Sequence, residues 1–284
     1  MNQVEDCDKA IYSHLQRIVS DGETPISQHL PHNTPSFFSY FESQHPEWAP
    51  GNSYVLHRDH PRLRGKEHAL VERVQKSGLC YMHAPIVMQH YLVAMNRDDL
   101  VPMVNLIDYM RKWASSKILR DHIWLNQGGK GSEFLMLLLG TDYTGHNLLV
   151  YPPNRSTDEE LIAAINYFGP GLLSGFSVKD DFVEEGTWQH CGKSDKVVLG
   201  LHAMLVVGYR QFIDDKGRSQ TRFLIQNWWK EKPYIEVDRD YLRCVGTTIN
   251  FIDTLPTEIP KLFGTNDMQQ VECSVDSCEF IADC

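Results

Sequence analysis

The chain has 284 residues, of which 42% are hydrophobic and 23% are charged, as in an ordinary globular protein. Its formal net charge of −10 at pH 7 argues against a general nucleic-acid or anionic-membrane partner. The longest strongly apolar run, residues 134–139, is too short to span a bilayer. The composition therefore indicates a globular chain without a membrane or nucleic-acid partner, and it leaves the oligomeric state open.

The cysteines and the N-terminus bear on the compartment. The first fifteen residues are polar and acidic and do not form a secretory signal. The seven cysteines are odd in number, and none of their spacings forms a CxxC zinc knuckle. These features predict reduced thiols and a cytoplasmic location.

The predicted elements fall into four parts in chain order. Residues 1–60 form an N-terminal extension with an amphipathic helix and an aromatic cluster, braced on a helical lobe or lying across a cleft as a prosegment. Residues 61–150 form the helical lobe, because apolar residues recur there at three- and four-residue steps. Residues 151–264 carry short β-rich runs with a turn at 214–219, and residues 265–284 form a tail. Helices followed by antiparallel strands predict an α+β fold with two lobes and a cleft between them.

The helical part begins with a cysteine in a reactive position. Cys80 follows Ser-Gly-Leu and precedes an apolar helical run. A thiol at a helix N-terminus feels the positive end of the helix dipole and free backbone N–H groups. This placement predicts a thiolate with a depressed pKa, although a cysteine in such a context is more often a buried core residue.

Two residues of the strand region complete a constellation with this cysteine. His202 opens the strand "GLHAMLVVGYR" and can pair with the thiol and protonate a leaving group. Asn227 lies on the next strand, after the hairpin, and can orient the imidazole through its side-chain oxygen. Trp228 and Trp229 can shield that hydrogen bond from water.

The ordered segments resemble those of the papain-like cysteine peptidases. "SGLCYMHA" is similar to the start of the nucleophile helix, and "NQGGKGSEFLMLLLG" to the Asn-Gly-Gly segment. "GPGLLSGFSV" is similar to the Gly-Pro strand, and "GLHAMLVVGYR" with "FLIQNWW" to the histidine and asparagine strands. The resemblance spans residues 75–238 and implies a papain-like α+β fold with the active-site cleft between its lobes.

The resemblance also implies a role for each matching residue. Cys80 would be the nucleophile, His202 the general acid and base, and Asn227 the orienting residue. Gln75 would complete the oxyanion hole, although it lies one residue nearer the cysteine than in the plant enzymes. The residues that would bind substrate are Gly128, Gly129, Ser174, Leu201 and Trp228.

Three functions remain open on this basis. The first is a peptidase that cleaves peptide or protein substrates through an acyl-enzyme and needs no cofactor. The second keeps the chemistry but changes the acceptor, as in an amidase, transpeptidase or acyltransferase. The third is a catalytically silent papain-like binding module. A metal site built from Cys80, His83 and His90 matches no common ligand spacing and is not expected.

Overall fold

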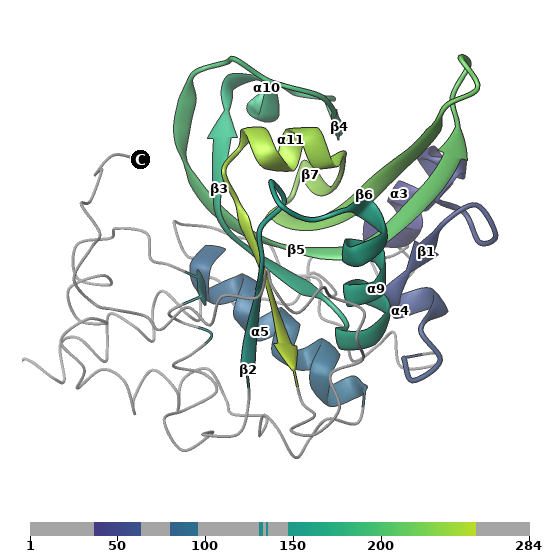
Figure 1. Ribbon diagram of the computed structural model, residues 1–284, viewed down its shortest axis with the longest axis vertical. Coiled ribbons are helices and arrows are strands. Elements are labelled where there is room, and N and C mark those ends of the chain that lie inside the picture. Colours follow the sequence, from purple (N-terminus) through teal and green to yellow (C-terminus); the bar gives the residue numbers. More distant parts are fainter. Residues whose placement is uncertain (1–36, 64–79, 96–130, 133–134, 136–146, 254–284) are drawn as a thin grey trace, which may run out of the picture.

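The computed structural model describes residues 37–63, 80–95, 131–132, 135 and 147–253 (Figure 1). The helices predicted within 1–36 and 96–125 and the tail at 265–284 lie outside the described residues. The described part combines one large sheet with separate helices, which confirms the predicted α+β class.

The sheet is antiparallel except where β4 pairs with β7. Its order is β2-β8-β3-β5-β6-β7-β4, and β1 pairs with β5. The strands are β1 (Tyr54–Val55), β2 (Asn147–Tyr151), β3 (Gly171–Lys179), β4 (Gln189–His190), β5 (Val198–Ile213), β6 (Ser219–Trp229), β7 (Lys232–Val237) and β8 (Thr248–Asp253). Strand β2 crosses the predicted boundary between residues 150 and 151, so the sheet includes residues that were expected in the helical lobe.

Strands β5 and β6 form the long hairpin that the sequence predicts, and Figure 1 shows it sweeping across the molecule. Asp214 closes the turn, because its Oδ1 atom accepts the backbone N–H groups of Lys216 and Arg218, each at 2.9 Å. Gly217 has φ of 73°, a conformation that glycine adopts without steric cost. Hydrogen bonds within the turn therefore stabilise it, away from the centre of the sheet.

The helices surround the sheet and have recognisable local signals. Helix α9 has a capping box, in which Thr157 and Glu160 each accept the other's backbone N–H. Asp238 caps α11 by accepting the N–H of Tyr241 at 2.7 Å. The helical segments are α3 (Phe37–Gln44), η1 (Pro46–Trp48), α4 (Leu56–Asp59), α5 (Cys80–Ala94), α9 (Asp158–Phe168), α10 (Asp180–Val183) and α11 (Arg239–Cys244). Among the described helices, none is long and apolar enough to cross a membrane.

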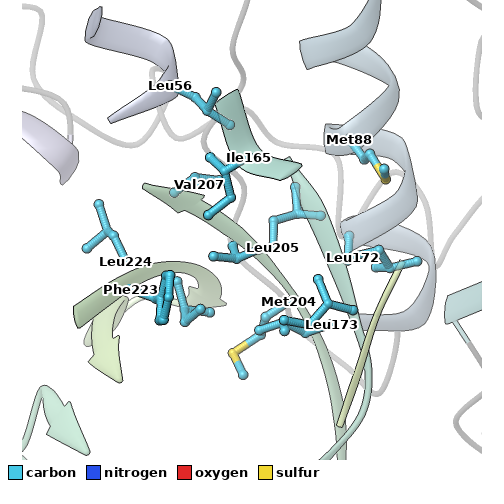
Figure 2. Close-up of a cluster of buried hydrophobic side chains, with 14 of the residues drawn as sticks. Leu56, Met88, Ile165, Leu172, Leu173, Met204, Leu205, Val207, Phe223 and Leu224 are labelled. Atoms are coloured by element: carbon cyan, nitrogen blue, oxygen red, sulfur yellow. The ribbon is translucent and has the colours of Figure 1, made fainter. Parts of the chain in front are cut away.

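Helix α5 is the buried helix of the fold. Most of its described side chains are apolar and buried, and it packs against β3 and β5 (Figure 1). Figure 2 shows Met88 of this helix in the same apolar cluster as Leu172 of β3 and Leu205 of β5. Pro85 lies inside the helix, which continues beyond it to Ala94. The core thus ties the helix that begins at Cys80 to the strands of the candidate site.

Residues 37–63 pack on the sheet, and they also contact α5, where Tyr91 Oη lies 3.3 Å from His57 Nδ1. Strand β1 pairs with β5, where Val55 lies opposite Gly208. A side chain at Gly208 would place its Cβ 2.5 Å from the carbonyl oxygen of Tyr54, so only glycine permits this approach. Phe38 and Phe41 of α3 contact the ring of Tyr234 on β7. The physical reason is that the aromatic rings of this segment pack against the ring of Tyr234 on β7.

A buried carboxylate joins this segment to the sheet. Glu236 of β7 is 1% exposed, and it accepts two hydrogen bonds from Arg210 of β5, at 2.7 and 3.0 Å. The indole Nε1 of Trp48 donates to the same carboxylate at 2.9 Å. A charge in this position is tolerated because its oxygens are paired and hydrogen-bonded.

This ion pair leads to a first prediction. Replacing Glu236 with alanine leaves the guanidinium of Arg210 buried without its partner, and we expect the free energy of unfolding to fall by about 3–5 kcal/mol. The matched control is Asp240→Ala, which removes an exposed ion pair with Arg243 and should cost less than about 1 kcal/mol. Urea denaturation measures both values, and equal losses for the two variants would contradict the account.

Candidate active site

Strands β5 and β6 bring the predicted histidine and asparagine together. Leu205 of β5 lies opposite Gln226 of β6 in their antiparallel ladder. His202 comes shortly before Leu205 and Asn227 directly follows Gln226, so both lie at the end of the hairpin away from its turn. His202 Nε2 lies 2.7 Å from Asn227 Oδ1, and both side chains are buried. Two residues that are 25 positions apart in the chain thus form a direct hydrogen bond.

The orientation of the asparagine amide follows from its other contacts. Asn227 Oδ1 accepts the backbone N–H of Trp228 at 2.8 Å, and Nδ2 donates to the carbonyl oxygen of Lys232 at 2.9 Å. The amide oxygen must therefore face the histidine, and His202 Nε2 carries the proton that it donates. This tautomer leaves Nδ1 of His202 as the atom that can accept a proton.

The two tryptophans have different positions. Trp229 is half-buried, and its ring stacks on the imidazole of His202 with centroids 5.1 Å apart. Trp228 is fully buried, and its Nε1 donates to the carbonyl oxygen of Ala203 at 2.8 Å. Trp228 was predicted to bind substrate, but in this structure it has no exposed surface to offer. It supports the strand behind the histidine, because the alternation of β6 turns its side chain inward.

Cys80 lies at the first described residue of α5 and is 7% exposed. Burial raises the pKa of its thiol, while N–H groups of Ala203, Tyr81 and Cys80 itself act on the sulfur in the opposite direction. The contact with the N–H of Ala203 places the sulfur next to the residue that follows His202. The sulfur of Cys80 thus lies beside the backbone of β5 at the position after His202, and His202 contacts Asn227.

Burial also changes the pKa of His202. Desolvation lowers the pKa of His202 to about 4, and the hydrogen bond that His202 donates to Asn227 offsets only part of that effect. With the pKa of Cys80 raised and that of His202 lowered, both groups are neutral at pH 7 in this structure. The sequence predicted a thiolate with a depressed pKa, and the direction for Cys80 is the opposite. The reason is that burial outweighs the N–H groups at the start of the helix.

The remaining predicted site residues are placed as follows. Gln75, Gly128 and Gly129 lie outside the described residues. Leu201 is 69% exposed and directly precedes His202, so its side chain is available at the surface of the site. Ser174 is buried, and its hydroxyl accepts a hydrogen bond from Asn250 Nδ2 at 3.1 Å. The hydroxyl of Ser174 therefore forms a hydrogen bond between two strands of the sheet.

Metal ligation has no support from the described geometry. In the part of the chain that the structure describes, no three His, Cys, Asp or Glu side chains are placed to hold a metal ion. His83 is buried, and its ring lies 6.3 Å from that of Trp228.

Sequence reasoning did not identify three contributors to the surroundings of the site. They are the backbone N–H of Ala203, the ring of Phe182 and the side chain of Lys232. Phe182 and Lys232 lie in charge-rich stretches that are typical of solvated loops, and both are buried. The apolar residue within "DDFV" was the one available signal, because a phenylalanine between charges often marks a buried anchor.

Comparison with known proteins gives structural similarity only. No family model and no curated protein sequence matches the chain. The SERA5 proenzyme from Plasmodium falciparum is 11% identical over 79% of this chain and 71% of its own, with a TM-score of 0.45. A structure from work on the mite allergens Blo t 1 and Der p 1 is 13% identical over 89% of this chain and 95% of its own, with a TM-score of 0.45. A digestive procathepsin L 3 from Tenebrio molitor larval midgut is 24% identical over 45% and 41%, with a TM-score of 0.27. With identities and TM-scores this low, the roles of residues rest on contacts within this chain.

A second buried histidine lies near the site. His190 is 3% exposed and stacks on Phe182 with centroids 5.0 Å apart. Burial first, and then the nearby charge of Lys232, lowers the pKa of His190 to about 4. His190 and His202 are therefore both neutral in the folded chain across most of the pH range in which an exposed histidine titrates.

Because both histidines have lowered pKa values, we expect the free energy of unfolding to fall in acid. Between pH 6.5 and about 4 the unfolded chain binds protons that the folded chain excludes, so the free energy of unfolding decreases as the pH falls through this window. Each histidine contributes up to roughly 3 kcal/mol over the full window. Urea denaturation at pH 7 and pH 5 measures the slope, and His190→Leu should remove about half of it. An unchanged slope in that variant would exclude His190 as a source.

Proposed function

We propose that the chain is a cysteine-type peptidase that acts through Cys80, His202 and Asn227. The observation that carries the proposal is the 2.7 Å contact between His202 Nε2 and Asn227 Oδ1. The backbone N–H of Ala203, the residue after His202, acts on the sulfur of Cys80. The proposal is also supported by the orientation of the asparagine amide, which leaves Nδ1 of His202 as a proton acceptor. A nucleophile, a base and an orienting residue are the three parts of this type of site.

The proposed reaction starts from the neutral pair. Nδ1 of His202 takes the thiol proton as the sulfur of Cys80 forms a bond to the peptide carbonyl carbon. The proton then passes to the departing amine as the C–N bond breaks, which leaves an acyl-enzyme. Water attacks the acyl group as His202 takes the water proton, and the S–C bond then breaks as His202 returns that proton to the sulfur, which regenerates the thiol and the neutral imidazole. Asn227 keeps the imidazole in one tautomer through both steps.

Stabilisation of the oxyanion and binding of substrate complete the proposal. The backbone N–H of Cys80 is proposed to donate to the oxyanion, and Gln75 is the proposed second donor. Gly128 and Gly129 are proposed to bind the extended backbone of a peptide substrate, and the exposed side chain of Leu201 to contact it. A reducing, cytoplasmic compartment is proposed because Cys80, Cys191 and Cys244 are free thiols.

One observation favours a second candidate, a binding module without activity. Cys80 and His202 are both less than a tenth exposed, and burial keeps both neutral. A site of this kind reacts only if a substrate or reagent reaches the sulfur. An amine acceptor in place of water, as in a transpeptidase, uses the same residues and differs only in the product.

The proposal predicts distinct effects for the three residues. The full chain, incubated with a mixed peptide library, should cleave a subset of peptides, and Cys80→Ala or His202→Ala should abolish cleavage. Asn227→Ala should lower kcat/KM by roughly 100-fold, because it misplaces the imidazole without removing it. Mass spectrometry of the products, with and without an added amine, distinguishes hydrolysis from transfer.

A second measurement separates a silent module from an enzyme whose substrate is missing from the library. An epoxysuccinyl reagent alkylates a thiol while an acid group protonates the opened ring, so it reports on the Cys80 and His202 pair directly. Labelling of Cys80 at pH 7 should be lost in His202→Ala. Absence of both cleavage and labelling in a folded wild-type chain would overturn the peptidase proposal in favour of the binding module.

A further inference from the structure

We propose that the side chain of Lys232 is a positioning group for the candidate site: its ammonium holds Phe182 behind Trp229, and Trp229 holds the imidazole ring of His202 against Asn227. This inference rests on the proposed role of His202. It assigns a function to a charged residue of the hairpin between β6 and β7 that the reaction itself does not use.

The first step is the anchoring of the ammonium. Lys232 is 8% exposed, and its Nζ donates to the carbonyl oxygen of Phe182 and to that of Glu184, the latter at 3.0 Å. The same Nζ lies 5.2 Å from the centroid of the Phe182 ring. A cation at the last carbonyls of a helical turn is favourable, and these carbonyls belong to the end of α10. Lys232 thus connects the β6–β7 hairpin to the end of α10, which carries Phe182.

The second step runs through the aromatic rings. Phe182 is fully buried and meets Trp229 edge to face, with centroids 5.3 Å apart at an angle of 72°. Trp229 in turn stacks on His202 at 5.1 Å. Edge-to-face and offset-stacked pairs of this kind restrict the tilt of each ring. The position of Phe182 therefore limits where the indole can lie, and the indole limits the imidazole.

The third step is the main chain of the same lysine. Its carbonyl oxygen accepts the Nδ2–H of Asn227 at 2.9 Å, and Lys232 pairs with Trp229 across the turn at residues 230–231. Both supports of the imidazole, the amide on one side and the indole on the other, are therefore in contact with Lys232. Movement of this residue would disturb the two together.

The cost of burying the charge indicates why a lysine is needed. Burial lowers the pKa of Lys232, while the carboxylates of Glu184 and Asp181 act to raise it. An apolar side chain would avoid this cost, but it would leave the carbonyl groups of Phe182 and Glu184 without their donor. The ammonium is favoured because it satisfies both carbonyls and still packs on the ring.

The test compares two lysines of one hairpin. Lys232→Met removes the ammonium and keeps the length of the side chain, whereas Lys230→Met removes an exposed charge two residues earlier. The first readout is NMR titration of His202 in the full chain with labelled histidine. The second is the rate at which an epoxysuccinyl reagent labels Cys80 at pH 7. Circular dichroism establishes that each variant is folded.

We expect Lys232→Met to slow labelling by roughly 10- to 100-fold, as for a small misplacement of a catalytic group. The pKa of His202 should move from about 4 towards 6.5 as the ring loses its cover. Lys230→Met should match the wild type in both readouts, and Lys232→Arg should restore most of the labelling because it retains a donor to both carbonyls.

If Lys232→Met does not fold, Phe182→Leu provides the same test, because it removes the ring behind Trp229 and keeps an apolar side chain. A folded Lys232→Met or Phe182→Leu protein with wild-type His202 titration and labelling rate would overturn the inference. A folded wild-type chain that shows neither peptide cleavage nor labelling of Cys80 would instead overturn the proposed function, so the two failures are distinguishable.

Discussion

The antiparallel pairing of β5 with β6 is the constraint on which the candidate site depends. It brings His202 and Asn227 within hydrogen-bonding distance at one end of the hairpin, while Asp214 closes the other end. Strand β5 also pairs with β3 and β1 and packs on α5. A slip of one residue in this ladder would turn His202 to the opposite face of the sheet, so register and site geometry are a single property.

Burial explains both the precision and the chemical state of the site. Packing of Trp228 and Trp229 excludes water from the imidazole, which strengthens its hydrogen bond to Asn227. The same exclusion disfavours charge, so the thiol and the imidazole are neutral in this structure. The proposed chemistry therefore relies on proton transfer during attack and does not require a resting ion pair.

Two buried charges near the site illustrate how the fold uses polar groups. Glu236 joins β7, β5 and the segment at Trp48, and Lys232 joins the β6–β7 hairpin to the end of α10. The desolvation cost of each charge is offset by hydrogen bonds that it makes with groups far away in the chain. Because such contacts have strict geometry, they specify how neighbouring segments sit on the sheet more than apolar contacts do.

The sequence by itself determined the α+β class, the β5–β6 hairpin and the candidate residues Cys80, His202 and Asn227. The class and the hairpin are local features, because strand alternation, turn residues and helix periodicity depend on neighbours within a few positions. The three candidate residues follow from the order of the motifs over residues 75–238. Only the tertiary structure decided that residues 37–63 pack on the sheet, that Trp228 is buried while Trp229 covers His202, and that burial raises the pKa of Cys80. It also decided that the ammonium of Lys232 is buried against the carbonyl groups of Phe182 and Glu184. The physical reason is that burial and long-range contacts depend on which distant segments meet, and residue order alone does not state this.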